Sequence, residues 1–136
     1  MSWITPKIDW SATDRFNIVD YNRIKNNLNY LWEESQKIWG EYDIEDMGAN
    51  LTSYASYWRY QDFNRFENNL ETINNHMLRD NFGAKQTFYP NGVFIGFEEL
   101  NRIENACLTM KATIDGWYEA MAILPFRLGN KGGIKE

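Results

Sequence analysis

A nine-residue motif that occurs three times limits what this chain can fold into. Residues 20–28 read DYNRIKNNL, residues 62–70 read DFNRFENNL, and residues 99–107 read ELNRIENAC. The shared order is acid, apolar, Asn, Arg, apolar, charged, Asn, and then Asn or Ala, and the copies start 42 and 37 residues apart. A repeat at this period indicates one supersecondary unit that is used three times.

Each copy opens an amphipathic helical pattern. From the residue after the acid, apolar residues recur at spacings of three and four, which is typical of a helix with one buried face. In the third copy this apolar seam continues through Leu100, Ile103, Cys107, Met110, Ile114, Trp117, Met121 and Leu124. The pattern predicts helices over about 17–39, 57–79 and 97–123. We therefore expect a mainly α fold, a three-helix bundle built from the three repeated motifs.

The acid at the head of each motif has a local explanation. Asp20, Asp62 and Glu99 are expected in the first helical turn, where a carboxylate faces unpaired backbone N–H groups and the positive end of the helix dipole. Asn17 and Gly96 precede their acids by three residues and are acceptable N-caps.

Capping residues, turn residues and prolines predict the connections between the helices. Because Arg59 is a poor N-cap, the second helix is expected to begin earlier, near Ser53 or Ser56. A Pro-Asn-Gly turn between two β-type runs predicts a small β-hairpin near 86–95. Pro125 is expected to end the third helix, since proline lacks the N–H that a helix interior needs.

The length of 136 residues indicates a single domain. We expect an N-terminal arm at 1–15, a helical core at 16–124 and an extended C-terminal tail at 125–136. One cysteine and one histidine exclude an internal disulfide and a Cys/His zinc site. Adjacent carboxylates such as Glu33 and Glu34 point apart on a helix and have no nucleophile beside them, so we expect neither an enzyme nor a cofactor.

Charge and hydropathy narrow the class of partner. The formal charge of -5 opposes a phosphate-binding face, so no nucleic-acid partner is expected. The chain has no run of about 20 apolar residues, so no membrane span is expected.

The polar motif residues have two interpretations. In the first, the Asn side chains flank the seam and bind loop backbone, while each Arg pairs with an acid of a neighbouring helix. In the second, they form a surface that contacts partners in three similar ways. The aromatic residues, 16% of the chain, either fill space beneath the loops or form a protein–protein surface or a sugar-binding platform. The candidate interface residues are Trp3, Trp10, Arg23, Asn26, Arg65, Asn68, Arg102, Asn105, Phe126, Arg127 and Leu128.

The first motif and the residues before it resemble a known family. The spaced residues are Trp10, Asp14, Phe16, Asn17, Asp20, Asn22, Arg23, Ile24 and Asn27. This opening resembles helical segments in tail and baseplate proteins of phages, prophages and phage-tail-like bacteriocins of Gram-positive bacteria. The stretch LPFRLGNKGGI, residues 124–134, is also similar to C-terminal segments in that group.

The resemblance implies a non-enzymatic structural or adaptor component of a phage tail or tail-like injection particle. Such proteins link the baseplate or tail tip to receptor-binding fibres, so the implied partners are other tail, baseplate or fibre proteins. Separately, the three similar helices predict an approximate threefold surface that suits a trimeric fibre as partner. The implied location is the virion or tail-like particle, assembled in the host cytoplasm. The alternative function is a carbohydrate- or receptor-binding module that presents Trp and Tyr.

Overall fold

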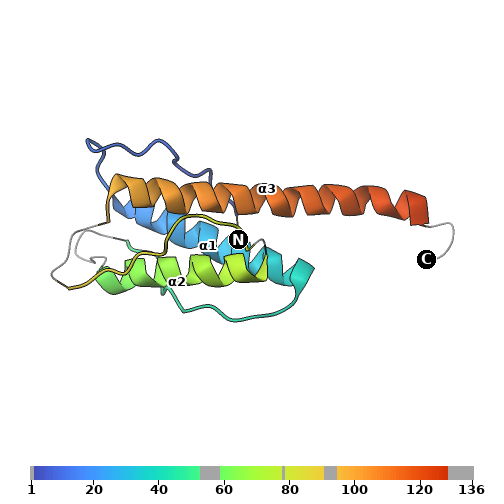
Figure 1. Cartoon of the computed structure of the whole chain (residues 1–136), viewed down its shortest axis with the longest axis horizontal. Coiled ribbons are helices and arrows are strands. Elements are labelled where there is room, and N and C mark those ends of the chain that lie inside the picture. Colours follow the sequence, from blue (N-terminus) through green and yellow to red (C-terminus); the bar gives the residue numbers. More distant parts are fainter. Residues whose placement is uncertain (1, 53–58, 78, 91–94, 129–136) are drawn as a thin grey trace.

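Three helices lying side by side make up the fold (Figure 1). They are α1 (Ile18–Trp39), α2 (Tyr60–His76) and α3 (Phe97–Leu128). The computed structural model describes residues 2–52, 59–77, 79–90 and 95–128, with 123–128 described by their backbone. Within these ranges the chain is mainly helical and contains no strand. The predicted mainly α class is therefore confirmed.

The motif apolar residues form the centre of the core. The second, fifth and ninth residues of every motif are each 4% exposed or less. They are Tyr21, Ile24 and Leu28 in α1, Phe63, Phe66 and Leu70 in α2, and Leu100, Ile103 and Cys107 in α3. Spacings of three and four residues place these side chains on one face of each helix, and the three faces pack against one another.

The motif acids stabilise the starts of the first two helices. The backbone N–H of Asn17 donates to Asp20 at 2.9 Å, and that of Arg59 donates to Asp62 at 2.7 Å. Helix α2 begins at Tyr60, with Arg59 as its N-cap, which corrects the predicted start at 57. Arg59 offers no capping side chain, but Asp62 satisfies its N–H from inside the first turn. The suggested caps Ser53 and Ser56 lie outside the described residues.

The expectation that Pro125 ends the third helix is wrong. Helix α3 continues to Leu128 and extends well beyond the ends of α1 and α2 (Figure 1). Proline removes one backbone hydrogen bond and crowds the carbonyl four residues earlier, which weakens a helix without always ending it. The predicted extended tail at 125–136 is therefore helical as far as 128, and residues 129–136 lie outside the described residues.

The predicted β-hairpin near 86–95 is also absent from the part of that segment that the structure describes. Residues 86–90 and Ile95 belong to no strand, and the turn at 91–94 lies outside the described residues. In a hairpin, the N–H and C=O of alternate residues bind the partner strand. Both groups of Phe88 are instead bound by the side chain of Asn64 in α2.

Candidate functional site

Three motif asparagines, one from each helix, bind both backbone groups of a loop residue. In each pair the loop N–H donates to the side-chain Oδ1, and the side-chain Nδ2 donates to the loop carbonyl. The six bonds are 2.7 to 3.0 Å long. The pairs are Asn22 with Leu51, Asn64 with Phe88, and Asn101 with Trp10. An amide side chain has a donor and an acceptor in one plane, so it can satisfy a loop backbone that has no partner strand.

A second set of asparagines does the same at other loop positions. Asn27 binds both backbone groups of Ile4, and Asn69 binds both groups of Glu45. These two residues occupy the eighth motif position, which in α3 is Ala106. Outside the motif, Asn74 pairs in this way with Asp80 at 2.8 and 3.1 Å. Much of the asparagine content of the chain is thus used to fix loops.

The bound loop residues mark three segments that we call straps. Two of them, residues 4–10 and 45–51, begin and end at a bound residue. The third, residues 82–88, ends at the bound Phe88 and is defined with the same length. The last residue of each strap is apolar and is the one bound by the third motif residue. In the first two straps, the first residue is bound by the eighth motif residue of a different helix. Each of these two straps therefore links two helices.

The sixth motif residue approaches the middle of each strap, and its charge decides which backbone group it meets. The N–H of Lys7 donates to Glu104 at 3.1 Å. Lys25 instead donates its Nζ to the carbonyl of Gly48 at 2.9 Å. The backbone amide of Gln86 lies near enough to lower the pKa of Glu67, although burial raises it more.

Arg23 lies at the centre of a buried ion network. Its Nε and Nη2 donate to the two carboxylate oxygens of Glu104 at 2.7 and 2.8 Å, and its Nη1 donates to Asp20 at 2.8 Å. Glu104 is 1% exposed and also accepts the indole N–H of Trp10 at 2.6 Å. Burial lowers the pKa of Arg23, but the hydrogen bonds to Glu104 and Asp20 outweigh this and raise it. The network fixes the arm against α1 and α3.

Arg102 makes the equivalent network in α3. Its Nη2 donates to Glu67 of α2, and its Nε donates to Glu99 at 2.7 Å. Glu67 is 1% exposed, and its Oε1 has no hydrogen-bond partner within the described residues. Desolvation raises the pKa of Glu67 despite the opposing charge of Arg102.

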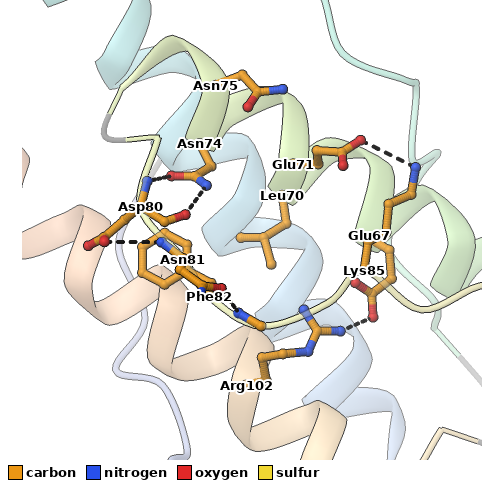
Figure 2. A pocket seen from close by; sticks show the side chains of 11 residues that line it. Glu67, Leu70, Glu71, Asn74, Asn75, Asp80, Asn81, Phe82, Lys85 and Arg102 are labelled. Carbon is orange, nitrogen blue, oxygen red and sulfur yellow. Dashed lines mark hydrogen bonds and ion pairs between the residues drawn. The ribbon is translucent and has the colours of Figure 1, made fainter.

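A cavity of about 210 Å³ lies beside the Arg102 network, between α2 and the loop that follows it (Figure 2). Four of its charged groups are paired with one another, Glu67 with Arg102 and Glu71 with Lys85, and Asp80 accepts the backbone N–H of Asn81 at 3.0 Å. Its loop wall is held by the Asn74–Asp80 pair. The cavity is therefore a polar gap closed by internal contacts, and its lining contains no nucleophile with an adjacent base.

The remaining motif candidates also have partners within the chain. Asn26 donates to the carbonyl of Ser2 at 2.6 Å, and Asn68 donates to Glu45 at 2.7 Å. Asn105 is exposed and donates to the carbonyl of Asn101 one turn earlier. Arg65 pairs with Asp62 at 3.1 Å and keeps 42% of its side-chain surface exposed.

The remaining interface candidates are two tryptophans of the N-terminal arm and three residues near the C-terminus. Trp10 is 5% exposed and belongs to the core, so it is not available to another chain in this conformation. Trp3 is partly buried against Tyr30, with Lys111 over both rings. The remaining candidates, Phe126, Arg127 and Leu128, form the last turn of α3.

The straps were missed by the sequence reasoning, although a signal for them exists. Trp10, Leu51 and Phe88 precede their motif acids by 10, 11 and 11 residues. An apolar residue 10 or 11 residues before the motif acid marks the end of each strap. This signal is a single residue in each copy, whereas the apolar pattern of the motif helix is longer and denser.

Comparison of the chain with protein-family models, with curated proteins and with solved structures finds no match. Over the residues that the structure describes, no helix is long and apolar enough to cross a membrane. The same residues contain no group of three His, Cys, Asp or Glu side chains that could hold a metal ion.

Proposed function

We propose that the chain is three copies of one strap-and-helix unit closed into a ring. The strap at 4–10 contacts its own helix α1 through Asn27 and contacts α3 through Asn101. The strap at 45–51 contacts its own helix α2 through Asn69 and contacts α1 through Asn22. The strap at 82–88 precedes α3 and contacts α2, the helix before its own, through Asn64.

The arginine contacts support the same cyclic order. Arg23 of α1 reaches Glu104 of α3, and Arg102 of α3 reaches Glu67 of α2. In both cases the fourth motif residue of one helix pairs with the sixth motif residue of the helix before it in the ring. This arrangement explains why the Asn and Arg positions recur in all three copies.

We further propose that this protein is a non-enzymatic structural adaptor of a phage tail or tail-like injection particle. In this role it links the baseplate or tail tip to receptor-binding fibres through protein–protein contacts. The observation that carries the proposal is the free end of α3, which projects beyond the other two helices (Figure 1). Its seam is fully buried at Ile114 but 40% exposed at Met121, and the neighbouring Tyr118 is 39% exposed.

An apolar helix end of this kind suits docking to another protein. A partner that buries the seam would continue the packing that α1 and α2 provide along the N-terminal part of α3. The contacts of the polar motif residues support the same conclusion. Their side chains mostly hold the fold together, which leaves the helix end as the surface for partners. The motif resemblance to tail and baseplate proteins supplies the class of particle.

Mass spectrometry of purified tail particles from an induced host culture tests the proposal. We expect peptides of this chain to copurify with baseplate proteins through a density gradient. Intact, infective or bactericidal particles that lack the chain would overturn the assignment.

A pair of variants tests the surface itself. Met121→Glu places a charge on the projecting seam and should abolish incorporation into particles while leaving the melting temperature unchanged. Val19→Glu is the matched control, since Val19 is 73% exposed at the opposite end of the bundle. Equal incorporation of both variants would exclude the α3 end as the docking surface.

The ring of three units also has the symmetry of a trimeric fibre. If the adaptor docks on a fibre along this axis, native mass spectrometry of the isolated complex should give one chain per fibre trimer. A ratio of one to one would favour docking on single subunits.

A further inference from the structure

The three motif arginines differ in the number of carboxylates that they meet. Arg23 and Arg102 each pair with two, one from the first turn of their own helix and one from a neighbouring helix. Within the described residues, Arg65 pairs with Asp62 alone. The missing carboxylate corresponds to the sixth motif residue of α1, which is Lys25 where the other helices have glutamate.

This exchange removes the net negative charge from the group around Arg65. Arg23 with Asp20 and Glu104 sums to one positive and two negative charges, a net of -1, and the Arg102 group sums to the same. At the corresponding position Arg65 and Lys25 are positive, and Asp62 and Asp46, whose charge acts on Lys25, are negative, a net of 0. In a chain with an overall charge of -5, this position thus lacks the net negative charge of the other two.

Within the part of the chain that the structure describes, Lys25 itself has no directly paired carboxylate. It is 6% exposed, and its Nζ donates to the carbonyl of Gly48. Burial lowers its pKa, and the charge of Asp46 only partly opposes this effect. Asp46 is meanwhile the acceptor for the backbone N–H of Gly48 at 2.8 Å.

A cavity of about 700 Å³ gives access to Arg65. Its wall includes Arg59, Asp62 and the strap residues Met47 and Leu51. Because 42% of the Arg65 side chain is exposed, a group from outside the chain can reach the guanidinium. A guanidinium has five N–H donors, and the bond to Asp62 uses one of them.

We propose that Arg65 binds the carboxylate of an Asp or Glu side chain of a partner protein. This carboxylate takes the place that Glu104 fills at Arg23 and that Glu67 fills at Arg102. A single negative charge restores the arrangement of two carboxylates around one arginine, whereas the nearby Asp46 and Asp62 disfavour a dianion such as phosphate. Met47 and Leu51 offer an apolar wall for the methylene groups of the incoming side chain.

The test is a titration of the full-length protein followed by NMR of the backbone amides of residues 61–66. The probe is the capped tripeptide acetyl-Ala-Glu-Ala-amide, compared at constant ionic strength with its Gln counterpart, with acetate and with inorganic phosphate. We expect saturable shifts with the Glu peptide and none with the Gln peptide. Phosphate and acetate are expected to bind at least threefold more weakly than the Glu peptide.

Three variants sharpen the result. Arg65→Gln removes the guanidinium, and Lys25→Glu supplies the missing carboxylate from within the chain, so both should weaken peptide binding at least tenfold. Arg15→Gln changes another exposed arginine and should leave binding unchanged.

Equal binding of the Glu and Gln peptides, or unchanged binding in Arg65→Gln, would overturn the proposal. Equal binding of phosphate would indicate a general anion site, and equal binding of acetate would indicate a small free carboxylate; both outcomes contradict a partner side chain. If Lys25→Glu does not fold, Arg65→Gln alone decides, since its side chain is half-exposed. The absence of the chain from tail particles would overturn the proposed function without affecting this titration.

Discussion

The side chain of Asn101 holds both backbone groups of Trp10, which precedes it by 91 residues. The N–H of Trp10 donates to Oδ1 at 2.8 Å, and Nδ2 of Asn101 donates to the Trp10 carbonyl at 3.0 Å. The indole of the same tryptophan donates to Glu104 one turn further along α3. The N-terminal arm is thus an integral part of the bundle, because an amide side chain replaces the partner strand that it lacks.

Replacing Asn101 with Asp should destabilise the protein although the two side chains have the same shape. The carboxylate keeps an acceptor for the Trp10 N–H but turns an oxygen towards the Trp10 carbonyl, which then loses its donor. Loss of one hydrogen bond together with a partly buried repulsive contact should lower the free energy of unfolding by about 2–3 kcal/mol. Urea denaturation followed by tryptophan fluorescence measures this change.

Asn105→Asp is the matched control for that experiment. Asn105 is exposed and donates only to a carbonyl of its own helix. Exposed substitutions of this kind change stability by about 0.5 kcal/mol or less. Equal losses in the two variants would show that attachment of the strap does not stabilise the fold.

Glu104→Ala should be among the most damaging single substitutions in the chain. Glu104 accepts hydrogen bonds from Arg23, from the indole of Trp10 and from the backbone of Lys7. Its removal leaves the buried Arg23 with Asp20 alone, and breaking a buried pair in this way costs about 3–5 kcal/mol. The loss is measured by urea denaturation.

Glu71→Ala provides the comparison for an exposed ion pair. Glu71 meets Lys85 at 3.3 Å with half of its side-chain surface exposed, so its removal should cost less than about 1 kcal/mol. A cost for Glu104→Ala that falls to the level of Glu71→Ala would contradict the importance of the buried network.

The helices and the core could be predicted from the sequence because both depend on local periodicity. The seam placed Ile24, Phe66 and Ile103 on buried faces, and all three are 1% exposed or less. The first-turn acids were also predictable, since Asp20 and Asp62 act within three residues of their own position. Contacts of this range leave a regular spacing that a single sequence reveals.

The strap contacts could not be predicted from the sequence in the same way. A bond from Asn64 to the backbone of Phe88 does not depend on which side chain Phe88 carries, so the apolar last residue of each strap is a much weaker signal than the helical seam. The same bond explains why the hairpin prediction failed, because β-type residues with satisfied backbone groups need no strand partner. Pro125 was misjudged because its effect on a helix depends on context, and here the helix continues past it.

The ionisation of Tyr21 should make stability fall at alkaline pH. Burial, together with the nearby charge of Asp62, raises the pKa of Tyr21 to about 12, above its usual value of 10.0. A group whose pKa is higher in the folded state than in the unfolded state makes its full contribution to stability when the pH is below the unfolded pKa. This contribution is lost as the pH rises to the folded pKa. Between pH 10 and pH 12 the protein should therefore lose on the order of 2 kcal/mol through this residue.

Tyr21→Phe isolates that contribution from those of the other tyrosines. The variant should show a shallower loss of stability than the natural protein between pH 10 and pH 12, measured by urea denaturation at each pH. Parallel curves for the two proteins would mean that Tyr21 does not ionise in this range. Ultraviolet absorbance of phenolate gives an independent measure of the same titration.

Gly83→Ala should show how tightly the Arg102 network is held. Gly83 has a φ of 89°, and a Cβ at this position would lie 2.6 Å from Cδ of Arg102. Arg102 cannot move aside freely, because Glu67 and Glu99 both bind its guanidinium. Gly48 has a φ of 75°, but a Cβ built there has no atom within 4 Å. Gly48→Ala therefore measures the cost of the backbone strain without a steric clash.

We expect Gly48→Ala to cost about 1 kcal/mol and Gly83→Ala about 2–4 kcal/mol. The excess should disappear when Arg102 is also changed to Ala, because the shortened side chain leaves room for the new methyl group, and a double-mutant cycle measures this coupling. Additive costs in the cycle would mean that the arginine moves aside at no expense. In that case the Arg102–Glu67 contact would not be a rigid joint between α3 and α2.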